Sequence, residues 1–240
     1  MEPRPWVRDF APVAAAFALY PVVALAQGAD RAVALGNASA IAEAEQAAGL
    51  FVEPAAYAWA AGIPWLLAAA GVAYLVLHVP VLLGALAWVY LARPAAFPRL
   101  RTAFLAAQTL TLAGYLLVPT APPRMLGALG FGDTLSDLWG AEAAAGAHWL
   151  QSPFAAMPSG HVVFALLAGG ALAALARPLA WRVAGALYPP FVVALTVVTA
   201  NHFWLDAAGS LAVVAVAVPT ALLAHRSPPR RARAYAPGSG

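Results

Sequence analysis

Long apolar runs alternate with short polar stretches along this chain. The runs cover roughly residues 10–27, 64–92, 102–118, 161–176, 183–200 and 204–224. About 20 consecutive apolar residues suffice for a helix to cross the hydrocarbon core of a bilayer. The pattern therefore predicts an all-α, polytopic membrane protein with six transmembrane helices in a bundle.

The polar stretches between and after these runs predict the remaining organisation. Residues 28–60 mix alanine with Glu43 and Glu45, which predicts a surface or interfacial helix between the first two spans. Residues 119–158 form the longest polar loop. We expect residues 1–225 to make a single membrane domain. The arginine- and proline-rich residues 226–240 are expected to form a disordered basic tail.

The composition excludes most alternatives to a membrane protein. The chain has 240 residues, of which 63% are hydrophobic and 10% charged, whereas soluble domains carry roughly 25% charged residues. The absence of cysteine excludes disulfides, thiol catalysis and thiolate metal sites. The cationic residues occur in short clusters between apolar runs, a pattern typical of membrane orientation rather than nucleic-acid binding.

The distribution of arginine predicts the orientation in the membrane. If the N-terminus is cytoplasmic, most arginines fall on the cytoplasmic side: Arg4, Arg8, Arg93, Arg99, Arg101, Arg177, Arg182, Arg226, Arg230, Arg231 and Arg233. Arg31 and Arg124 fall on the other side. By the positive-inside rule, we expect an inner (plasma) membrane protein with both termini in the cytoplasm. Cleavage after Ala26, as in a signal peptide, is an alternative that leaves the later spans in the same orientation.

Three short motifs fall at the outer boundary under this topology. They are Pro-Thr-Ala-Pro-Pro-Arg at 119–124, Met-Pro-Ser-Gly-His at 157–161 and Asn-His-Phe-Trp-Leu-Asp at 201–206. Segments about 80 residues apart would thus converge at one membrane depth. We therefore expect a polar site on the extracytoplasmic face.

The residues of these motifs are suited to phosphoryl transfer. His202 and Asp206 are four residues apart, so on a helix the carboxylate can bond one imidazole nitrogen and leave the other as a nucleophile. A second histidine, His161, can act as the acid that protonates a leaving oxygen. Such a site needs neither a metal ion nor another cofactor.

The neighbouring residues are suited to binding phosphate. Ser159 is a plausible helix cap, and Gly160 lets an anion approach the exposed N–H groups of the helix N-terminus. The guanidinium of Arg124 can form paired hydrogen bonds with phosphate, and Asn201 is placed to orient His202 or contact the substrate.

Each of these features also has a purely structural interpretation. Asp206 can cap a helix, the Pro-Ser-Gly-His segment can be a turn, and Arg124 can be an interfacial anchor. Tyr115 is expected to be an interfacial aromatic residue, with a place in the lining of the pocket as the alternative. His78 is expected to be a neutral histidine bonded to a neighbouring helix, at the wrong depth for this site. Asp133 and Asp137 are expected to solvate a surface helix, with contact to a sugar or inositol hydroxyl as the alternative.

The two histidine motifs resemble signature motifs of the type 2 phosphatidic acid phosphatase superfamily. The resemblance rests on Pro158-Ser159-Gly160-His161 and on His202 followed by Asp206, and it covers about residues 60–225. It implies a six-helix membrane core and a phosphohistidine intermediate. It also implies that His202 is the nucleophile, Asp206 its orienting partner and His161 the general acid.

Two features of that superfamily are missing. Leu86 stands where its first motif has a lysine ahead of Arg-Pro, and Leu195 and Thr196 replace the Ser-Arg of the third motif. The 119–124 and 200–206 segments instead resemble the branch containing inositol phosphorylceramide synthases, in which an arginine such as Arg124 helps to hold the phosphate.

The resemblance implies a phospholipid or polyprenyl phosphate substrate taken from the bilayer. It leaves open whether the acceptor is water, as in a phosphatase, or an alcohol, as in inositolphosphotransferases. A non-catalytic lipid-binding or transport protein is the alternative from another class.

Overall fold

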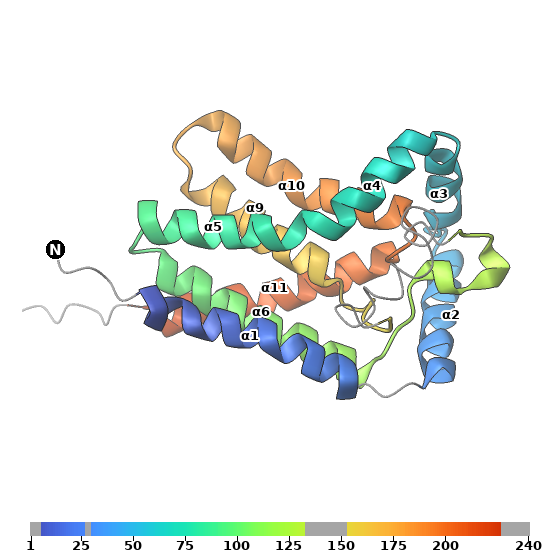
Figure 1. Cartoon of the computed structure of the whole chain (residues 1–240), viewed down its shortest axis with the longest axis horizontal. Coiled ribbons are helices and arrows are strands. Elements are labelled where there is room, and N and C mark those ends of the chain that lie inside the picture. Colours follow the sequence, from blue (N-terminus) through green and yellow to red (C-terminus); the bar gives the residue numbers. More distant parts are fainter. Residues whose placement is uncertain (1–5, 27–29, 133–152, 227–240) are drawn as a thin grey trace, which may run out of the picture.

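The computed structural model describes residues 6–26, 30–132 and 153–226, and within them it is all-α (Figure 1). The α-helices are α1 (Trp6–Ala26), α2 (Arg31–Ala47), α3 (Glu53–Ala61), α4 (Pro64–Val76), α5 (His78–Ala92), α6 (Phe97–Leu117), α9 (Gly160–Leu175), α10 (Leu179–Val198) and α11 (Trp204–Ala224). Two short 3₁₀ helices, η1 (Pro123–Met125) and η2 (Gly127–Leu129), follow α6. Asp133, Asp137 and the tail after Arg226 lie outside the described residues.

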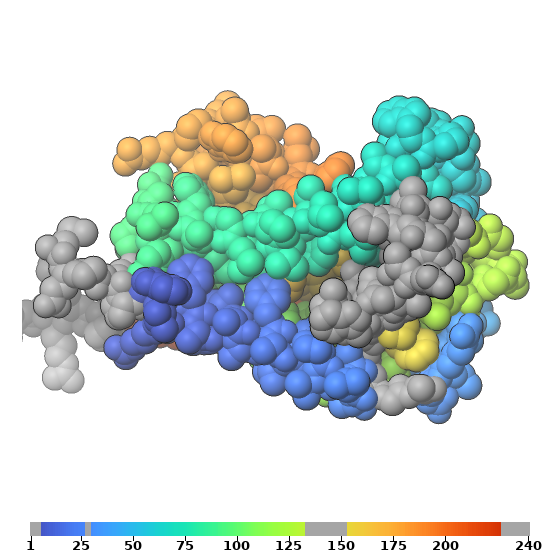
Figure 2. Space-filling view, in the orientation of Figure 1, coloured from blue at the N-terminus to red at the C-terminus, as the bar shows by residue number. Residues whose placement is uncertain are grey.

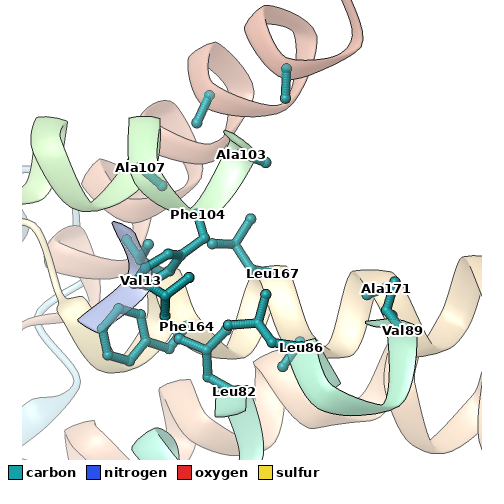
Figure 3. Packing of buried hydrophobic residues seen from close by; sticks show 14 of the residues in the cluster. Val13, Leu82, Leu86, Val89, Ala103, Phe104, Ala107, Phe164, Leu167 and Ala171 are labelled. Atoms are coloured by element: carbon teal, nitrogen blue, oxygen red, sulfur yellow. The ribbon is translucent and has the colours of Figure 1, made fainter. Parts of the chain in front are cut away.

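The long helices run lengthwise as a bundle, and α2 stands across one end of it (Figure 1). Helix α9 is central, since it contacts α5, α6, α10 and α11. Apolar residues spaced three or four apart form the faces that meet in the core, because this spacing places them on one side of a helix. The core side chains labelled in Figure 3 are Val13, Leu82, Leu86, Val89, Ala103, Phe104, Ala107, Phe164, Leu167 and Ala171.

The outer surface of the bundle carries many large apolar side chains. Figure 2 shows α1, α5 and α10 on one face of the molecule. Large exposed apolar residues on these helices include Leu19, Val22, Leu25, Leu91, Trp181, Leu187 and Phe191. A helix that is apolar all round belongs in lipid rather than in water, so this surface fits a protein embedded in a bilayer.

Fewer helices meet the length and composition of a complete span than the sequence predicts. In the described part of the chain, α1, α10 and α11 are each long and apolar enough to cross a membrane. The pair α3 and α4, bent by 118° at their junction, is a fourth candidate if it counts as one span. Helices α5 and α9 have 15 and 16 residues, and α6 begins with Arg99 and Arg101 near its start. Six spans therefore remain a prediction.

Two of the predicted elements are divided in the structure. The apolar run 64–92 forms two helices, α4 and α5, which meet at Leu77. The expected surface helix in residues 28–60 is likewise two helices, α2 and α3. On α2 the buried residues Ala34, Ala38, Ala42 and Glu45 are spaced four, four and three apart, so they form one face. That face packs on the end of the bundle, next to Ala121, Phe154 and Phe203.

Helices α9 and α10 approach closely because glycines face each other at their contact. A Cβ atom on Gly169 would lie 2.5 Å from the carbonyl oxygen of Gly185, and one on Gly185 would lie 2.6 Å from the backbone nitrogen of Ala173. Both obstacles are backbone atoms, which cannot rotate away. By contrast, a Cβ on the neighbouring Gly170 would meet no atom within 4 Å.

We therefore predict that Gly169→Ala forces α9 and α10 apart, whereas Gly170→Ala does not. Overpacking of this kind lowers the free energy of unfolding by about 1–3 kcal/mol. Thermal unfolding of the purified protein in detergent should show a lower melting temperature for Gly169→Ala and an unchanged or slightly higher one for Gly170→Ala. Equal melting temperatures for the two variants would contradict the close contact.

Candidate functional site

Three loops meet at the end of the bundle where α6 and α10 end and α9 and α11 begin. Backbone hydrogen bonds tie them together: the N–H of Thr120 donates to the carbonyl of Phe154 over 2.8 Å, and that of Ala156 donates to Thr120 over 3.1 Å. The N–H of Arg124 donates to the carbonyl of Ala200 over 3.0 Å. The three motifs singled out in the sequence therefore lie together in space.

His202 is held at its Nδ1 atom by two acceptors. Nδ1 lies 2.9 Å from the carbonyl oxygen of Ala156 and 3.2 Å from Oδ2 of Asp206. Because both partners can only accept, Nδ1 must carry the proton, and in the neutral ring Nε2 then keeps its lone pair. Nε2 is buried and has no hydrogen-bond partner among the described residues. The ring thus presents a nucleophilic nitrogen.

Asp206 is fully buried in the first turn of α11. Its Oδ2 also accepts a hydrogen bond from the backbone N–H of Phe203 over 2.9 Å. The predicted pairing with His202 and the alternative interpretation as a helix cap therefore both hold for this carboxylate. The cap holds Asp206 in place, and Asp206 in turn holds the imidazole.

The start of α9 places His161 at the site. The Oγ atom of Ser159 accepts from the N–H of Val162 over 3.4 Å, which makes Ser159 the N-cap of α9, as the sequence suggests. The N–H of Gly160 donates to the Tyr115 hydroxyl over 3.1 Å, and a Cβ on Gly160 would lie 2.8 Å from that oxygen. Position 160 therefore has no room for a side chain.

The expectation for Tyr115 is wrong, and so is the expected depth of His78, although its expected bond to a neighbouring helix is confirmed. Tyr115 is 4% exposed and contacts the start of α9, so it is a buried residue of the site rather than an interfacial aromatic residue. Nδ1 of His78 lies 3.2 Å from the carbonyl of Tyr74, and the His78 ring centroid lies 3.8 Å from that of His161. The break between α4 and α5 brings His78 to the depth of the site, which a continuous span through residues 64–92 would not do.

Aromatic rings fix the position of the His161 ring. Tyr74 stacks on it with a centroid distance of 4.1 Å and an interplanar angle of 17°. The ring of His202 lies 5.5 Å away at 62°. Nε2 of His161 is buried and has no hydrogen-bond partner among the described residues. Two imidazole rings thus lie next to each other, and the Nε2 atom of each has no hydrogen-bond partner among the described residues.

Arg124 and Asn201 are joined beside His202. Nη1 of Arg124 donates to Oδ1 of Asn201 over 2.6 Å, and the amide nitrogen of Asn201 donates to Oγ1 of Thr199 over 2.9 Å. Between them Ala200 has φ 51°, a left-handed conformation that is costly for a residue with a side chain. The hydrogen bond from the N–H of Arg124 to the carbonyl of Ala200 helps to stabilise this turn.

Two buried glutamates belong to the surroundings of the site, and the sequence analysis missed their role. Oε1 of Glu53 accepts from the N–H of Trp204 over 2.8 Å, and Oε1 of Glu45 accepts from the N–H of Leu205 over 2.9 Å. Burial, together with the neighbouring carboxyl group of Glu53, raises the pKa of Glu45 to about 8. The signal was present in the sequence, since Glu45 continues the stripe of buried alanines on α2.

The arrangement brings together all the residues that the sequence singled out for this site: Arg124, Ser159, Gly160, His161, Asn201, His202 and Asp206. Chemically it offers a nucleophilic nitrogen, a second imidazole for proton transfer, a guanidinium and the positive N-terminal end of α9. In the described part of the chain, no group of three or more His, Asp or Glu residues is placed to hold a metal ion.

Comparisons with known proteins agree with this chemistry. Neither the curated proteins nor the solved structures give a significant match to the chain. A family model described as the PAP2 superfamily matches residues 39–220, which contain every residue of the site and well over half of the chain. The members of that superfamily are metal-independent phosphatases and phosphotransferases that act on lipid phosphates in membranes. The chain therefore belongs to the PAP2 (type 2 phosphatidic acid phosphatase) superfamily, as an integral, multi-pass membrane enzyme.

Proposed function

We propose that this protein cleaves a lipid-linked phosphate, either a phospholipid or a polyprenyl phosphate, through a phosphohistidine intermediate on His202. The observation that carries the proposal is the pair of acceptors at Nδ1 of His202, which leaves Nε2 as the nucleophile. The neighbouring ring of His161 supports it, because its Nε2 is also available to a substrate.

The proposed reaction has two steps. In the first, Nε2 of His202 attacks phosphorus, the bond from phosphorus to the lipid oxygen breaks, and protonated His161 gives its proton to that oxygen. In the second, an acceptor hydroxyl attacks the phosphohistidine, returns its proton to His161 and frees His202. Asp206 stabilises the positive charge that develops on the His202 ring during the attack.

We propose that the phosphate lies between the N-terminus of α9 and Arg124. Ser159 and Gly160 form the start of that helix, whose dipole favours an anion. Arg124 supplies the positive charge that the family's missing Ser-Arg would otherwise bring, because its guanidinium bonds Asn201 next to the nucleophile. Asn201 then acts as the residue that aims this guanidinium.

We further propose that the site faces the extracytoplasmic side. The described arginines at the opposite end of the bundle are Arg8, Arg93, Arg99, Arg101, Arg177, Arg182 and Arg226. Arg31 and Arg124 belong to the end that holds the site. By the positive-inside rule, the arginine-rich end is cytoplasmic.

The roles of the two histidines can be separated with two kinds of substrate. We predict that His202→Ala and His161→Ala each lower turnover of a lipid phosphate by at least about a hundredfold, the usual contribution of such groups. A nitrophenyl phosphate ester has a leaving group that needs no proton, so His161→Ala should regain much of its rate on it, whereas His202→Ala should not.

His225→Ala is the matched control, because His225 bonds Thr102 at the opposite end of the bundle and should leave both rates unchanged. All variants must insert into membranes at wild-type levels. Near-full activity of His202→Ala on every lipid phosphate would overturn the mechanism. If a His161→Asn, His202→Asn double variant kept the biological function, the protein would be a lipid binder instead.

Asp206→Asn should keep the His202 tautomer but lose the negative charge beside it. The carbonyl of Ala156 still accepts from Nδ1 in this variant, so we expect kcat to fall by about a hundredfold with little change in KM. Steady-state kinetics on a purified lipid phosphate measure both constants. Asp30→Asn is the control, since asparagine caps α2 as well as aspartate does. An unchanged kcat would show that Asp206 only caps α11.

The acceptor decides between phosphatase and transferase activity. The 119–124 segment resembles that of inositolphosphotransferases, and we therefore propose transfer of a phospho-head group to an alcohol. Lipid labelled in its phosphate should then give a new labelled lipid when a ceramide is the alcohol acceptor, and a labelled inositol phosphate when inositol is the acceptor. Release of labelled inorganic phosphate alone, at a rate that the alcohols do not change, would indicate water as the acceptor.

A further inference from the structure

We propose that Glu45 and Glu53 are positioning residues that share one proton and, in that form, hold the first turn of α11 and hence the nucleophile. The inference rests on the proposed function and adds to it a means of pH control.

Three consecutive N–H groups at the start of α11 are each bonded to a carboxyl group. Phe203 donates to Asp206, Trp204 to Glu53 and Leu205 to Glu45, over 2.8 to 2.9 Å. The first N–H groups of any helix lack partners within the helix. The other helix start at the site, α9, meets this need with the local Ser159. Phe203, the N-cap of α11, has no side-chain acceptor, so distant carboxyls take that role.

The two glutamates reach α11 from the helices that cross the end of the bundle. Glu45 belongs to α2 and Glu53 to α3, and they precede their partners by 160 and 151 residues. Their bonds join the surface helices to the segment that carries His202 and Asp206. Release of this link would free the backbone of residues 203–205, and the imidazole at 202 would lose its fixed position.

The surroundings of the pair favour a single shared proton. The side chains of Glu45 and Glu53 are 1% and 0% exposed, and they bond the N–H groups of two consecutive residues, Leu205 and Trp204, which brings their carboxyl groups together. Two ionised carboxylates are both acceptors, so a bond between them requires a proton on one. If both carboxyl groups were ionised, the Oε2 atom of each would have no hydrogen-bond donor among the described residues. A buried pair of like charges is also unfavourable.

The other charged groups near the pair add to this effect. The described titratable groups that act on Glu45 are Glu53 from α3 and Asp206 from α11, and both are acidic. His202 is bonded to Asp206 and not to either glutamate. A third carboxylate therefore opposes full ionisation of the pair, and no described cation is bonded to either glutamate.

The sign of the pH effect follows from the raised pKa of Glu45, about 8 in the folded protein against 4.5 for an ordinary glutamate. A raised pKa means that the folded state holds a proton which the unfolded state has released. The stabilising contribution is therefore complete below pH 4.5 and is lost as the pH rises through about 8. Above this pH the pair becomes doubly charged, and the link between α2, α3 and α11 weakens.

Glu45→Gln tests the shared proton directly. The amide oxygen of glutamine can accept from Leu205, and its NH₂ can donate to Glu53, so the variant mimics the protonated acid at every pH. We predict that this variant has a near-wild-type kcat at pH 7, and that its kcat falls less than that of the wild type between pH 7 and 9.5. Glu45→Ala removes the acceptor and should lower kcat about tenfold at pH 7, because the backbone N–H of Leu205 is left without its hydrogen-bond partner.

Glu43→Gln is the matched control, because Glu43 lies exposed on the same helix and should leave the pH profile unchanged. A readout independent of turnover is amide hydrogen exchange of the peptide covering residues 203–206. Its protection factor should drop above pH 8 in wild type and in Glu43→Gln, but not in Glu45→Gln.

Equal loss of protection in wild type and Glu45→Gln, with equal alkaline fall in kcat, would overturn the shared-proton inference. That outcome differs from failure of the proposed function, in which the wild type turns over no lipid phosphate at any pH. In that case the exchange measurement still decides whether the pair controls the start of α11.

Discussion

Nδ1 of His202 faces two acceptors, the carbonyl of Ala156 and the carboxylate of Asp206. One acceptor comes from the loop before α9 and the other from α11, so a single imidazole joins the two segments. The same bonds determine which ring nitrogen keeps its lone pair. The position and the reactivity of His202 therefore depend on the same contact, and a shift of either loop would alter both.

The N-termini of α9 and α11 lie side by side, but different kinds of group accept hydrogen bonds from their backbone N–H groups. The backbone N–H of Ser159 donates to the carbonyl of Asp206. The Ser210 hydroxyl lies within hydrogen-bond distance of two carbonyl oxygens, 2.9 Å from that of Ser159 and 2.8 Å from that of Asp206. Three carboxyl groups surround the start of α11, whereas the neutral Ser159 and the Tyr115 hydroxyl meet the start of α9. A helix N-terminus attracts anions, and acidic groups repel them, so this difference supports the proposal that the phosphate lies at the start of α9.

Local spacing was enough to predict the parts of the site that lie within one helix turn. His202 and Asp206 pair because they are four residues apart, and Ser159 caps α9 because it directly precedes the helix. The carbonyl of Ala156 was not predictable, because any residue offers a carbonyl and its direction is set by the tertiary structure. The depth of His78 was misjudged for a related reason. Pro80 predicts a kink in the apolar run 64–92, but the size and direction of the break between α4 and α5 are set by tertiary packing.

The departure from the family's third motif is explained by how α10 ends. The carbonyl of Thr196 accepts from the N–H groups of both Asn201 and His202, so this position shapes the turn through its backbone. Its side chain is 1% exposed and bonds the carbonyl of Val193, which leaves no role there for a charged group. Phosphate transfer requires a cationic group beside the negative charge that develops on the phosphate, and any segment of the chain can supply that group. Arg124 comes from the loop after α6, and its guanidinium bonds Asn201, the residue before His202. In the proposed mechanism the cationic group therefore comes from another segment, while the backbone that positions His202 still comes from the end of α10.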